Sequence, residues 1–566
     1  MTPLEPFIHT PRIAYFSMEI ALRSEIPTYS GGLGVLAGDT LRASADLELP
    51  LVGVTLISRM GYFHQEIDER GHQIEQPDAW QPERWLVPLD AKIAIPIENR
   101  NVWVQAWLYR LTGATHQDIP VIMLDTNLPE NSIADREITH YLYGGDEAYR
   151  LKQEAVLGIG GTRMLHALGF EVHTYHMNEG HSALLALELL RQFERTKKEI
   201  GPGESIYDVA KVRELCLFTT HTEVEAGHDQ FSYELVSRIL GDFIEINELK
   251  LLAGTERLNM TQLAMSLSSY VNGVAKLQAS ITNNQFPGHA VHAVTNGVHG
   301  ETWACPGFAK LYDSYVPDWR HEPELLVRAD KIPDKEIWDA HAEAKQALIA
   351  RVRDLTGIEM ESQCPILGFA RRMTAYKRPY LLFSDVQRLV SIAKKYPFQI
   401  VLAGKAHPGD ESGKQMIADL RQYMHKLQGT IKIVFLPNYD MDTALTMVSG
   451  SDVWLNTPLR PLEASGTSGM KATFNGVLNL SVLDGWWLEG CIEGVTGWAI
   501  GSETMGASNG TDISSLYEKL EHTILPMYYE NRTGWIEVMK GGISKNACYF
   551  NAHRMMRRYA SEAYIR

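Results

Sequence analysis

The chain has 566 residues, of which 45% are hydrophobic and 22% charged, the composition of an ordinary globular protein with a large core. This length accommodates three or four average domains or two large α/β domains. The formal net charge is −16 at pH 7. Because nucleic acids and anionic membranes favour a basic face, neither is an expected partner.

The cysteines give no sign of disulfides or of a metal site. They are odd in number, far apart in the sequence and without metal-ligand spacing: Cys216, Cys305, Cys364, Cys491 and Cys548. Residues 1–10 lack the basic and apolar regions of a secretory signal, and no apolar run approaches the roughly 18 residues that span a bilayer. We therefore expect reduced thiols, no bound metal and a soluble cytoplasmic protein.

The chain begins with a predicted strand, a glycine-rich turn and a helix. Residues 12–19 alternate in polarity like a strand, and residues 29–39, YSGGLGVLAGD, open a helix that runs to about Leu47. Such a turn lets the backbone approach a ligand closely, although a tight structural turn has the same sequence pattern. The strand-rich segment 51–111 follows. It contains four tryptophans that we expect to pack in a sheet, with a carbohydrate platform as the alternative: Trp80, Trp85, Trp103 and Trp107.

Two later strands of the first half end in polar clusters. A helix at 149–168 leads to a strand at 172–177, which is followed by Asn178-Glu179-Gly180-His181 and a new helix from Ser182 to about Arg195. The apolar run 215–220 ends in the same way, at His221. Open α/β sheets bind ligands at this edge. His221 could also simply cap the turn that follows it.

The second half alternates between apolar runs and stretches long enough for a helix, the pattern of a parallel sheet. The runs are 366–370, 400–403, 431–436 and 453–455. Each is followed by polar residues, which parallel strands would bring to one edge: Arg371 and Arg372, Gly404 to Pro408, Asn438 and Tyr439, and Asn456 and Thr457. Residues 370–378 hold four cations. A solvated helix start is the plainer interpretation, but positive charge there opposes the helix dipole.

The stretch from Glu463 to Gly476 lies between apolar runs at 451–457 and 477–483 and reads as a strand-to-helix loop. Its small and hydroxyl-bearing residues would let backbone N–H groups converge on an anion at a helix N-terminus, so the loop is suited to hold a phosphate. It is not a Walker A loop, because Lys471 follows Met470 and precedes Ala472. From the loop alone, Lys471 could equally be an ordinary solvated lysine.

The string from Glu463 to Lys471, EASGTSGMK, resembles the Glu-Ala-Ser-Gly-Thr-x-x-Met-Lys segment of the α-glucan phosphorylase family, whose lysine carries pyridoxal 5′-phosphate. The resemblance extends from about Ile13 to the C-terminus. It implies a GT-B architecture: two doubly wound Rossmann-like α/β domains with an interdomain cleft. We expect a glucan-binding domain at 1–275 and a pyridoxal-phosphate domain at 276–566, with the helices after about Ser514 packing back on the first domain.

The resemblance also assigns roles to individual residues. The catalytic group would be Lys471, Arg372, Lys377 and His221. The cofactor-binding residues would be Lys471, Arg371, Tyr439, Thr467 and Ser468. The substrate-binding residues would be Gly31, Gly32, Leu33, Glu179, His181, Asn272, Glu463, Ser465 and Gly466. Two residues depart from the family pattern, Glu225 in place of proline and Gln278 in place of the usual histidine.

The implied reaction is the reversible phosphorolysis of an α-1,4-glucan by inorganic phosphate, which releases α-D-glucose 1-phosphate with retained configuration. Glucan, phosphate and glucose 1-phosphate are then the expected partners, and a homodimer is the expected assembly. Two alternatives stay open. One is a GT-B glycosyltransferase that uses a nucleotide sugar and does not need a cofactor on Lys471. The other is a glucan-binding protein without catalytic activity.

Overall fold

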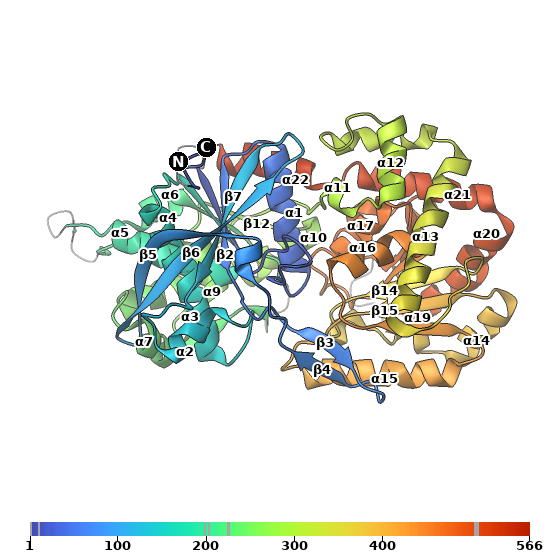
Figure 1. Cartoon of the computed structure of the whole chain (residues 1–566), viewed down its shortest axis with the longest axis horizontal. Coiled ribbons are helices and arrows are strands. Elements are labelled where there is room, and N and C mark those ends of the chain that lie inside the picture. The colour runs from blue at the N-terminus through green and yellow to red at the C-terminus, as the bar shows by residue number, and fades with distance from the viewer. Residues whose placement is uncertain are drawn as a thin grey trace. The chain divides into compact units, whose positions relative to one another are not determined.

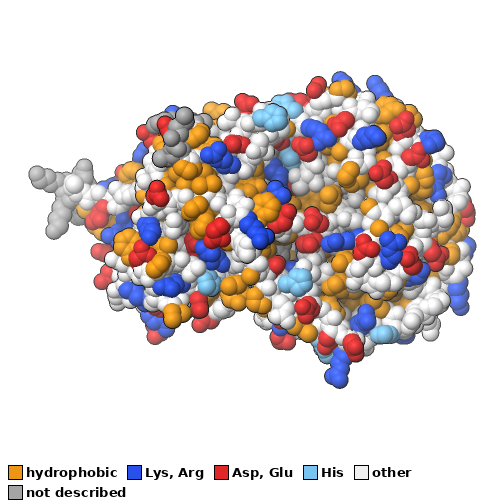
Figure 2. All heavy atoms as spheres, viewed as in Figure 1, with side chains coloured by type: hydrophobic (Ala, Val, Ile, Leu, Met, Phe, Trp, Pro, Cys, Tyr) orange, Lys and Arg blue, Asp and Glu red, His pale blue; other side chains and the backbone are white. Residues whose placement is uncertain are grey.

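A computed structural model describes residues 3–8, 12–196, 200–201, 204–222, 227–502 and 509–565. The chain forms two compact units (Figure 1). Unit 1 comprises Met1–Phe63, Pro77–Val294 and Met556–Arg566, and unit 2 comprises His64–Gln76 and Thr295–Met555. Within the described residues, no helix is both long and apolar enough to cross a membrane. On the face shown in Figure 2, acidic and basic side chains are interspersed.

Unit 1 is built on a nine-stranded sheet with the order β13-β12-β9-β8-β1-β2-β7-β6-β5. Neighbouring strands are parallel from β13 to β7, whereas β6 and β5 are antiparallel to their neighbours. The strands are β1 (Ile13–Phe16), β2 (Leu51–Leu56), β5 (Val87–Ile97), β6 (Arg100–Thr112), β7 (Asp118–Asp125), β8 (Thr174–Asn178), β9 (Cys216–Thr219), β12 (Tyr270–Gly273) and β13 (Val291–Ala293). Every residue of β1, β2 and β9 is buried, as expected for strands that are covered on both faces.

Helices and one small ribbon complete unit 1. The helices are α1 (Gly32–Asp46), α2 (Ile133–Arg136), α3 (Glu147–Ala155), α4 (Gly161–Ala167), α5 (Leu184–Gln192), α6 (Val209–Leu215), α7 (Tyr233–Leu240), α8 (Ile246–Ala253), α9 (Met260–Ser266) and α10 (Lys276–Gln285). A π-helical turn, Val156–Gly160, joins α3 to α4, so the predicted helix at 149–168 is one helical run with a bulge. The strands β10 (Gln230–Ser232) and β11 (Arg257–Asn259) pair with each other.

Unit 1 extends beyond the predicted boundary at residue 275. The helix α10 is the crossover that brings β13 into parallel register with β12, so the chain remains in this unit as far as Val294. The end of the chain also belongs to unit 1, but only from Met556. Its Tyr559 hydroxyl lies 3.1 Å from the Thr219 hydroxyl. The helices between about residue 514 and Met555 belong to unit 2, and their packing on the first domain stays a prediction.

Unit 2 contains a six-stranded, fully parallel sheet with the order β16-β15-β14-β17-β18-β19. Its strands are β14 (Ile366–Ala370), β15 (Gln399–Ala403), β16 (Lys432–Leu436), β17 (Val453–Asn456), β18 (Leu478–Val482) and β19 (Gly497–Ile500). The first five coincide with the apolar runs of the sequence to within one residue or so. The predicted parallel α/β class is therefore confirmed for this half of the chain.

The helices of unit 2 alternate with these strands or precede and follow them. They are α11 (Gly300–Trp303), α12 (Pro306–Tyr315), α13 (Asp334–Thr356), α14 (Val386–Lys395), α15 (Glu411–Leu427), α16 (Met441–Gly450), α17 (Thr467–Thr473), α18 (Trp487–Gly490), α19 (Asn509–Lys519), α20 (Leu525–Glu530) and α21 (Arg532–Gly541). The last helix, α22 (Ala552–Tyr559), begins in unit 2 and continues into unit 1 from Met556. A hairpin from the first quarter of the sequence, β3 (His64–Ile67) with β4 (Gln73–Gln76), also belongs to this unit.

Candidate functional site

The centre of the candidate site in unit 2 is one buried carboxylate that holds two cations. Glu463 accepts hydrogen bonds from the Arg371 guanidinium and the Lys377 ammonium through the same oxygen, Oε2. The other terminal nitrogen of the Arg371 guanidinium, Nη1, donates to the side-chain oxygen of Asn456, at the end of β17. All four side chains are buried. The parallel strands β14 and β17 thus bring polar residues to one edge of the sheet, as the sequence predicted.

The electrostatics of this cluster follow from its burial. Burial alone would raise the pKa of Glu463, but the charges and hydrogen bonds of Arg371 and Lys377 outweigh it and hold that pKa below its usual value. Two cations and one carboxylate leave the cluster with a net positive charge away from water. A buried site of this kind favours an anionic ligand.

The loop that carries Glu463 is hydrogen-bonded to the segment that follows β18. The Asp484 carboxylate accepts the N–H of Glu463 at 2.9 Å, and the N–H of Trp486 donates to the Ser465 carbonyl at 2.9 Å. Gly466 then adopts φ 81°, a left-handed conformation that suits glycine, and α17 begins at Thr467. The backbone path of the loop is therefore fixed at three successive points.

Lys471 lies on α17 with its side chain buried against an aromatic ring. Its Nζ is 4.0 Å from the centroid of the Trp303 ring, at the end of α11. The Ser468 hydroxyl accepts a hydrogen bond from the Trp454 indole N–H at 3.1 Å, and Thr467 is half-buried at the first position of the helix. A solvated surface lysine, the plainer interpretation of Lys471, does not fit this burial.

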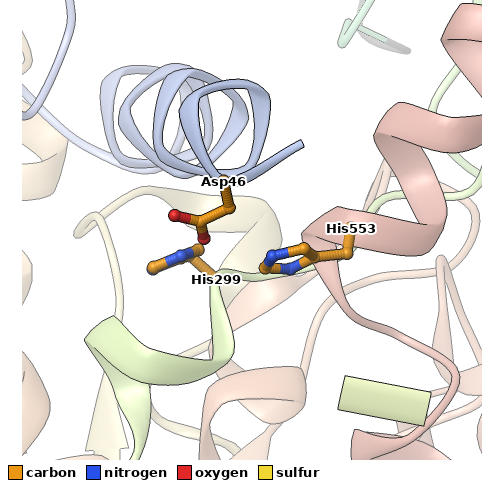
Figure 3. A group of neighbouring side chains, drawn as sticks. All are labelled: Asp46, His299 and His553. Carbon is orange, nitrogen blue, oxygen red and sulfur yellow. The ribbon is translucent and has the colours of Figure 1, made fainter. Parts of the chain in front are cut away.

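The short helix α11 is itself positioned by His299. The His299 side chain accepts the N–H of Thr302 at 3.3 Å as the N-cap of α11, and its Nδ1 lies 2.7 Å from the Thr302 hydroxyl. The ring of His553 stacks on it with the centroids 5.7 Å apart (Figure 3). Both histidines are buried. They fix the helix that places Trp303 against Lys471.

Two predicted residues of unit 2 are less enclosed. Arg372 is exposed, although it directly follows the buried Arg371. Tyr439 follows β16 and is half-buried. Burial raises the pKa of its hydroxyl, and the nearby Arg371 opposes that shift, so Tyr439 stays protonated at neutral pH. The structure thus brings Arg371, Lys377 and Glu463 into contact and leaves Arg372 facing solvent within this unit.

In unit 1, Glu19 holds the glycine-rich turn. Its carboxylate accepts the backbone N–H groups of Ser30 and Gly31, the Ser30 hydroxyl and, at 3.0 Å, the Tyr143 hydroxyl. Gly32, the next residue along, is exposed, and a Cβ added there would have no described atom within 4 Å beyond its chain neighbours. Gly31 and Leu33 are half-buried. Glu19 therefore anchors the start of the turn by hydrogen bonds, and the turn is open to a ligand at Gly32.

Glu179 organises the second group in unit 1. It adopts φ 71°, and its carboxylate accepts the N–H of His221 at 2.8 Å and the Thr222 hydroxyl at 2.9 Å. The His221 Nε2 lies 2.7 Å from Asn178 Oδ1. Burial lowers the pKa of His221 to about 4, so its ring is neutral at pH 7. The two predicted polar clusters after β8 and β9 therefore meet.

The remaining predicted residues of unit 1 have structural partners. His181 lies 3.4 Å from the Asp229 carboxylate, and burial lowers the pKa of its ring. The Asn272 side chain is fully buried and donates to the Tyr559 hydroxyl at 2.9 Å. Gln278, also buried, accepts the N–H of Val274 and so closes the turn into α10. Glu225 lies outside the described residues.

A family model described as carbohydrate phosphorylase matches residues 24–116 and 228–496. The chain belongs to this family. The match includes the turn at Gly31 and the cluster of Arg371, Lys377 and Glu463, but it leaves out the segment with Glu179 and His221. The resemblance inferred from the EASGTSGMK string is therefore confirmed.

Relatives in the carbohydrate phosphorylase family match nearly the whole chain. A maltodextrin phosphorylase of Thermococcus litoralis is 40% identical over 98% of this chain and 70% of its own length. A glycogen phosphorylase of Aquifex aeolicus is 35% identical over 98% of this chain and 86% of its own. One from Mycobacterium tuberculosis is 34% identical over 98% and 70%.

Sequence reasoning missed several residues of this phosphorylase-family site. Asn456 was noted only as a polar strand end, and Glu19 and Asp484 were given no role, although each binds a loop that was singled out. Each is a lone polar residue at or just beyond the end of an apolar run. That position was a usable signal, because parallel strands bring their carboxyl ends to one edge of the sheet.

Proposed function

We propose that this protein is an α-glucan phosphorylase that catalyses the reversible phosphorolysis of an α-1,4-glucan. A C1–O bond to inorganic phosphate forms as the glycosidic bond of the terminal glucosyl residue breaks, and the shortened glucan leaves with a proton taken up on the glycosidic oxygen. The other product is α-D-glucose 1-phosphate with retained configuration. Membership of the carbohydrate phosphorylase family and its maltodextrin and glycogen phosphorylase relatives support this reaction. The observation that carries the proposal is the buried, net-positive cluster of Arg371, Lys377 and Glu463 beside the Lys471 loop.

This cluster suits phosphate better than it suits hydrolysis by two carboxylates. A retaining glycosidase needs a second carboxylate about 5 Å away that acts as a nucleophile. Glu463 instead has one carboxylate oxygen engaged by two cations, which stabilise its charge and weaken it as a nucleophile. In a protein of net charge −16, a local group of cations of this kind is what an anionic substrate requires.

The residues around Lys471 fit pyridoxal 5′-phosphate. The buried Lys471 amine is the group that would bear the cofactor, with the Trp303 ring beside it. In the same loop, the Ser465 hydroxyl oxygen is buried and finds no hydrogen-bond partner among the described residues, as expected of a group that awaits a ligand, which we assign to the sugar. The backbone amides of Ser465 to Gly469, with the side chains of Thr467, Ser468, Arg371 and Tyr439, would hold the cofactor. By the family resemblance, Arg371 and Tyr439 would lie near its phosphate group.

When bound, the cofactor would supply a phosphate group whose second pKa near 6 lets it exchange a proton close to neutral pH. The protein's own residues position the other reactants. Arg372 and Lys377 hold substrate phosphate, and Glu463, Ser465 and Gly466 bind sugar hydroxyls. Substrate phosphate both attacks the sugar and faces the positive charge that develops on it, which is electrostatic stabilisation by preorganised groups.

Unit 1 would supply the glucan-binding side in a GT-B arrangement, where the strand ends of two α/β domains face one cleft. The exposed Gly32 leaves room for a ligand to approach the turn, so Gly31, Gly32 and Leu33 would cover the phosphate and the sugar. Neutral His221 would contribute its backbone oxygen beside the sugar, with Glu179 and His181 nearby. Asn272 would reach a sugar hydroxyl only if it left Tyr559. We place the enzyme in the cytoplasm as a homodimer.

The deciding experiment supplies purified protein with maltodextrin and inorganic phosphate and measures glucose 1-phosphate. We expect release that depends on phosphate and reverses when glucose 1-phosphate is added in excess. The same protein should not extend maltodextrin from a nucleotide sugar. Elongation from a nucleotide sugar without phosphate dependence would support the glycosyltransferase alternative, and glucan binding without turnover would support the non-catalytic one.

A further inference from the structure

The hairpin β3–β4 belongs to unit 2, although its sequence is inserted between two segments of unit 1. It lies beside α15 in Figure 1 and contacts that helix. At its turn, Gly71 has φ 90°, and a Cβ there would come within 2.9 Å of the Arg421 side chain and 3.1 Å of the Ala418 backbone. Glycine is therefore required for this close approach. The other end of the hairpin reaches the carboxyl ends of β15 and β16.

Gln65 makes the main contact there, and both the nitrogen and the oxygen of its side-chain amide form hydrogen bonds. Its backbone N–H donates to Asn438 Oδ1 at 3.1 Å, and its Oε1 accepts the Asn438 N–H at 2.9 Å. Its Nε2 donates to the Gly404 carbonyl at 3.0 Å and to Gln73 Oε1 at 2.8 Å. The Gln65 side chain is 1% exposed. Bonds this enclosed are shielded from competition by water.

Gln73 adds a second pair of bonds on the same side. Its Oε1 accepts the Ala406 N–H at 2.9 Å, and its Nε2 donates to the Ala406 carbonyl at 3.0 Å. The glutamine amide thus binds the backbone of one residue in both directions, as a neighbouring strand would. The two glutamines together hold the loop that leaves β15 and the turn that leaves β16.

The backbone that they hold has unusual conformations next to the candidate cofactor residues. Asn438, immediately before Tyr439, has φ 50°, a left-handed conformation that residues other than glycine seldom adopt. Gly404 has φ 143°, and a Cβ there would lie 1.9 Å from the Arg371 carbonyl oxygen. Its backbone is therefore pressed against that of Arg371. A shift at either point would move Tyr439 or Arg371.

We propose that the hairpin is a positioning element of the catalytic unit and that Gln65 is its key residue, fixing Tyr439 and Arg371 where they bind the phosphate end of the cofactor. The inference rests on the proposed function, because it assigns the partner of Tyr439 and Arg371. In this role Gln65 itself would touch neither substrate nor cofactor. Its effect should therefore appear in the binding of the phosphate group and not in the attachment of the aldehyde to Lys471.

The test compares Gln65→Leu with Glu66→Leu in the full chain. Glu66 is the adjacent, exposed residue on the opposite face of β3, so it controls for the same substitution in the same strand. Apo proteins are titrated with pyridoxal 5′-phosphate and with pyridoxal, which lacks the phosphate. We expect Gln65→Leu to weaken pyridoxal phosphate binding by about tenfold or more. Its pyridoxal affinity should match that of Glu66→Leu, whose affinities for both compounds should equal those of the wild type.

A second variant covers the case in which Gln65→Leu does not fold. Asn438→Gly allows the same left-handed backbone and removes the side chain whose Oδ1 accepts the Gln65 N–H, while the backbone N–H that Gln65 Oε1 accepts remains. It should therefore fold and lose pyridoxal phosphate affinity by a smaller factor. Equal losses for pyridoxal and pyridoxal phosphate, or no loss in either variant, would overturn the inference while leaving the proposed function intact. A wild-type protein that binds no pyridoxal phosphate would overturn both.

Discussion

The ammonium of Lys377 donates a hydrogen bond to the carboxylate of Glu463, and neither side chain is more than 10% exposed. Arg371 shares the same carboxylate oxygen. A buried charge must be paired, and here one carboxylate pairs with two cations that would otherwise repel each other. The glutamate is therefore the counter-ion of the two cations, and under the proposed function phosphate would be a second counter-ion for them.

Glu463→Gln tests whether Glu463 and phosphate are alternative counter-ions of Lys377 and Arg371. Removal of the carboxylate leaves two buried cations uncompensated, and breaking a buried pair destabilises by roughly 3–5 kcal/mol. We expect a lower Tm than the wild type without phosphate and a larger rise of Tm when phosphate is added. Glu411→Gln removes an exposed partner of Lys414 and should change neither. A Glu463→Gln protein with the wild-type Tm and the wild-type response to phosphate would contradict the counter-ion role.

Arg372→Ala and Lys377→Ala should have similar effects on phosphate use but different effects on stability. Both remove a cation assigned to substrate phosphate, and a charged hydrogen bond is worth roughly 1.5–3 kcal/mol, so the KM for phosphate should rise about tenfold or more in each. Lys377 is buried in an ion pair, whereas Arg372 is exposed, so Lys377→Ala should lower Tm more than Arg372→Ala. Steady-state kinetics with phosphate and with maltodextrin, together with thermal melts, separate these effects. Equal losses of phosphate and glucan affinity would argue against the assignment.

Lys471→Ala should abolish cofactor retention, because its amine is the group to which pyridoxal phosphate would attach. The wild type should carry about one cofactor per chain, measured after release in alkali. Lys471→Arg keeps the positive charge beside Trp303 but offers no primary amine, so it should also lose the cofactor while keeping a Tm near that of the apo wild type. A colourless wild-type protein that is fully active would contradict the cofactor assignment.

The second half of the fold was predictable because its strands are continuous apolar runs. Strands buried on both faces must be apolar throughout, and those of the parallel sheet therefore stand out against the amphipathic helices between them. The polar residues that follow them could be assigned to one edge for the same reason. Arg371 directly follows β14 and donates a hydrogen bond to Asn456, the last residue of the neighbouring strand β17.

What could not be predicted depends on contacts between distant parts of the sequence. The pattern of residues 64–76 indicates at most a hairpin, and nothing local indicates that Gln65 contacts Asn438, 373 residues away. Likewise, the pairing of Asn272 with Tyr559 spans 287 residues. The exposure of Arg372 beside the buried Arg371 depends on the path of the backbone after β14, which hydrophobic periodicity does not encode.

The buried carboxyl group of Asp484 should make the stability of the protein depend on pH. Its carboxylate is 2% exposed and accepts the N–H groups of Glu463 and Gly485, each at 2.9 Å. Burial raises the pKa of Asp484 to about 7 in spite of these bonds, and the charge of Glu463 adds to the rise. The folded protein thus holds this proton more tightly than the unfolded chain. Stability from this group is complete below pH 4 and is lost as pH rises from about 4 to 7, at up to roughly 1.4 kcal/mol per pH unit.

Asp484→Asn removes this titration, and we expect the Tm difference between wild type and variant to depend on pH. An asparagine can accept only one of the two N–H groups, so the variant should be the less stable protein at pH 5. At pH 8 the Asp484 carboxyl of the wild type is ionised in a buried position, which costs stability. The Tm difference between wild type and variant should therefore become smaller or change sign. Other titrating groups are common to both proteins and cancel in the difference. Asp339→Asn, whose side chain is 56% exposed, controls for the substitution itself. A Tm difference that stays constant from pH 5 to 8 would show that Asp484 is ionised throughout, and that its two N–H bonds outweigh its burial.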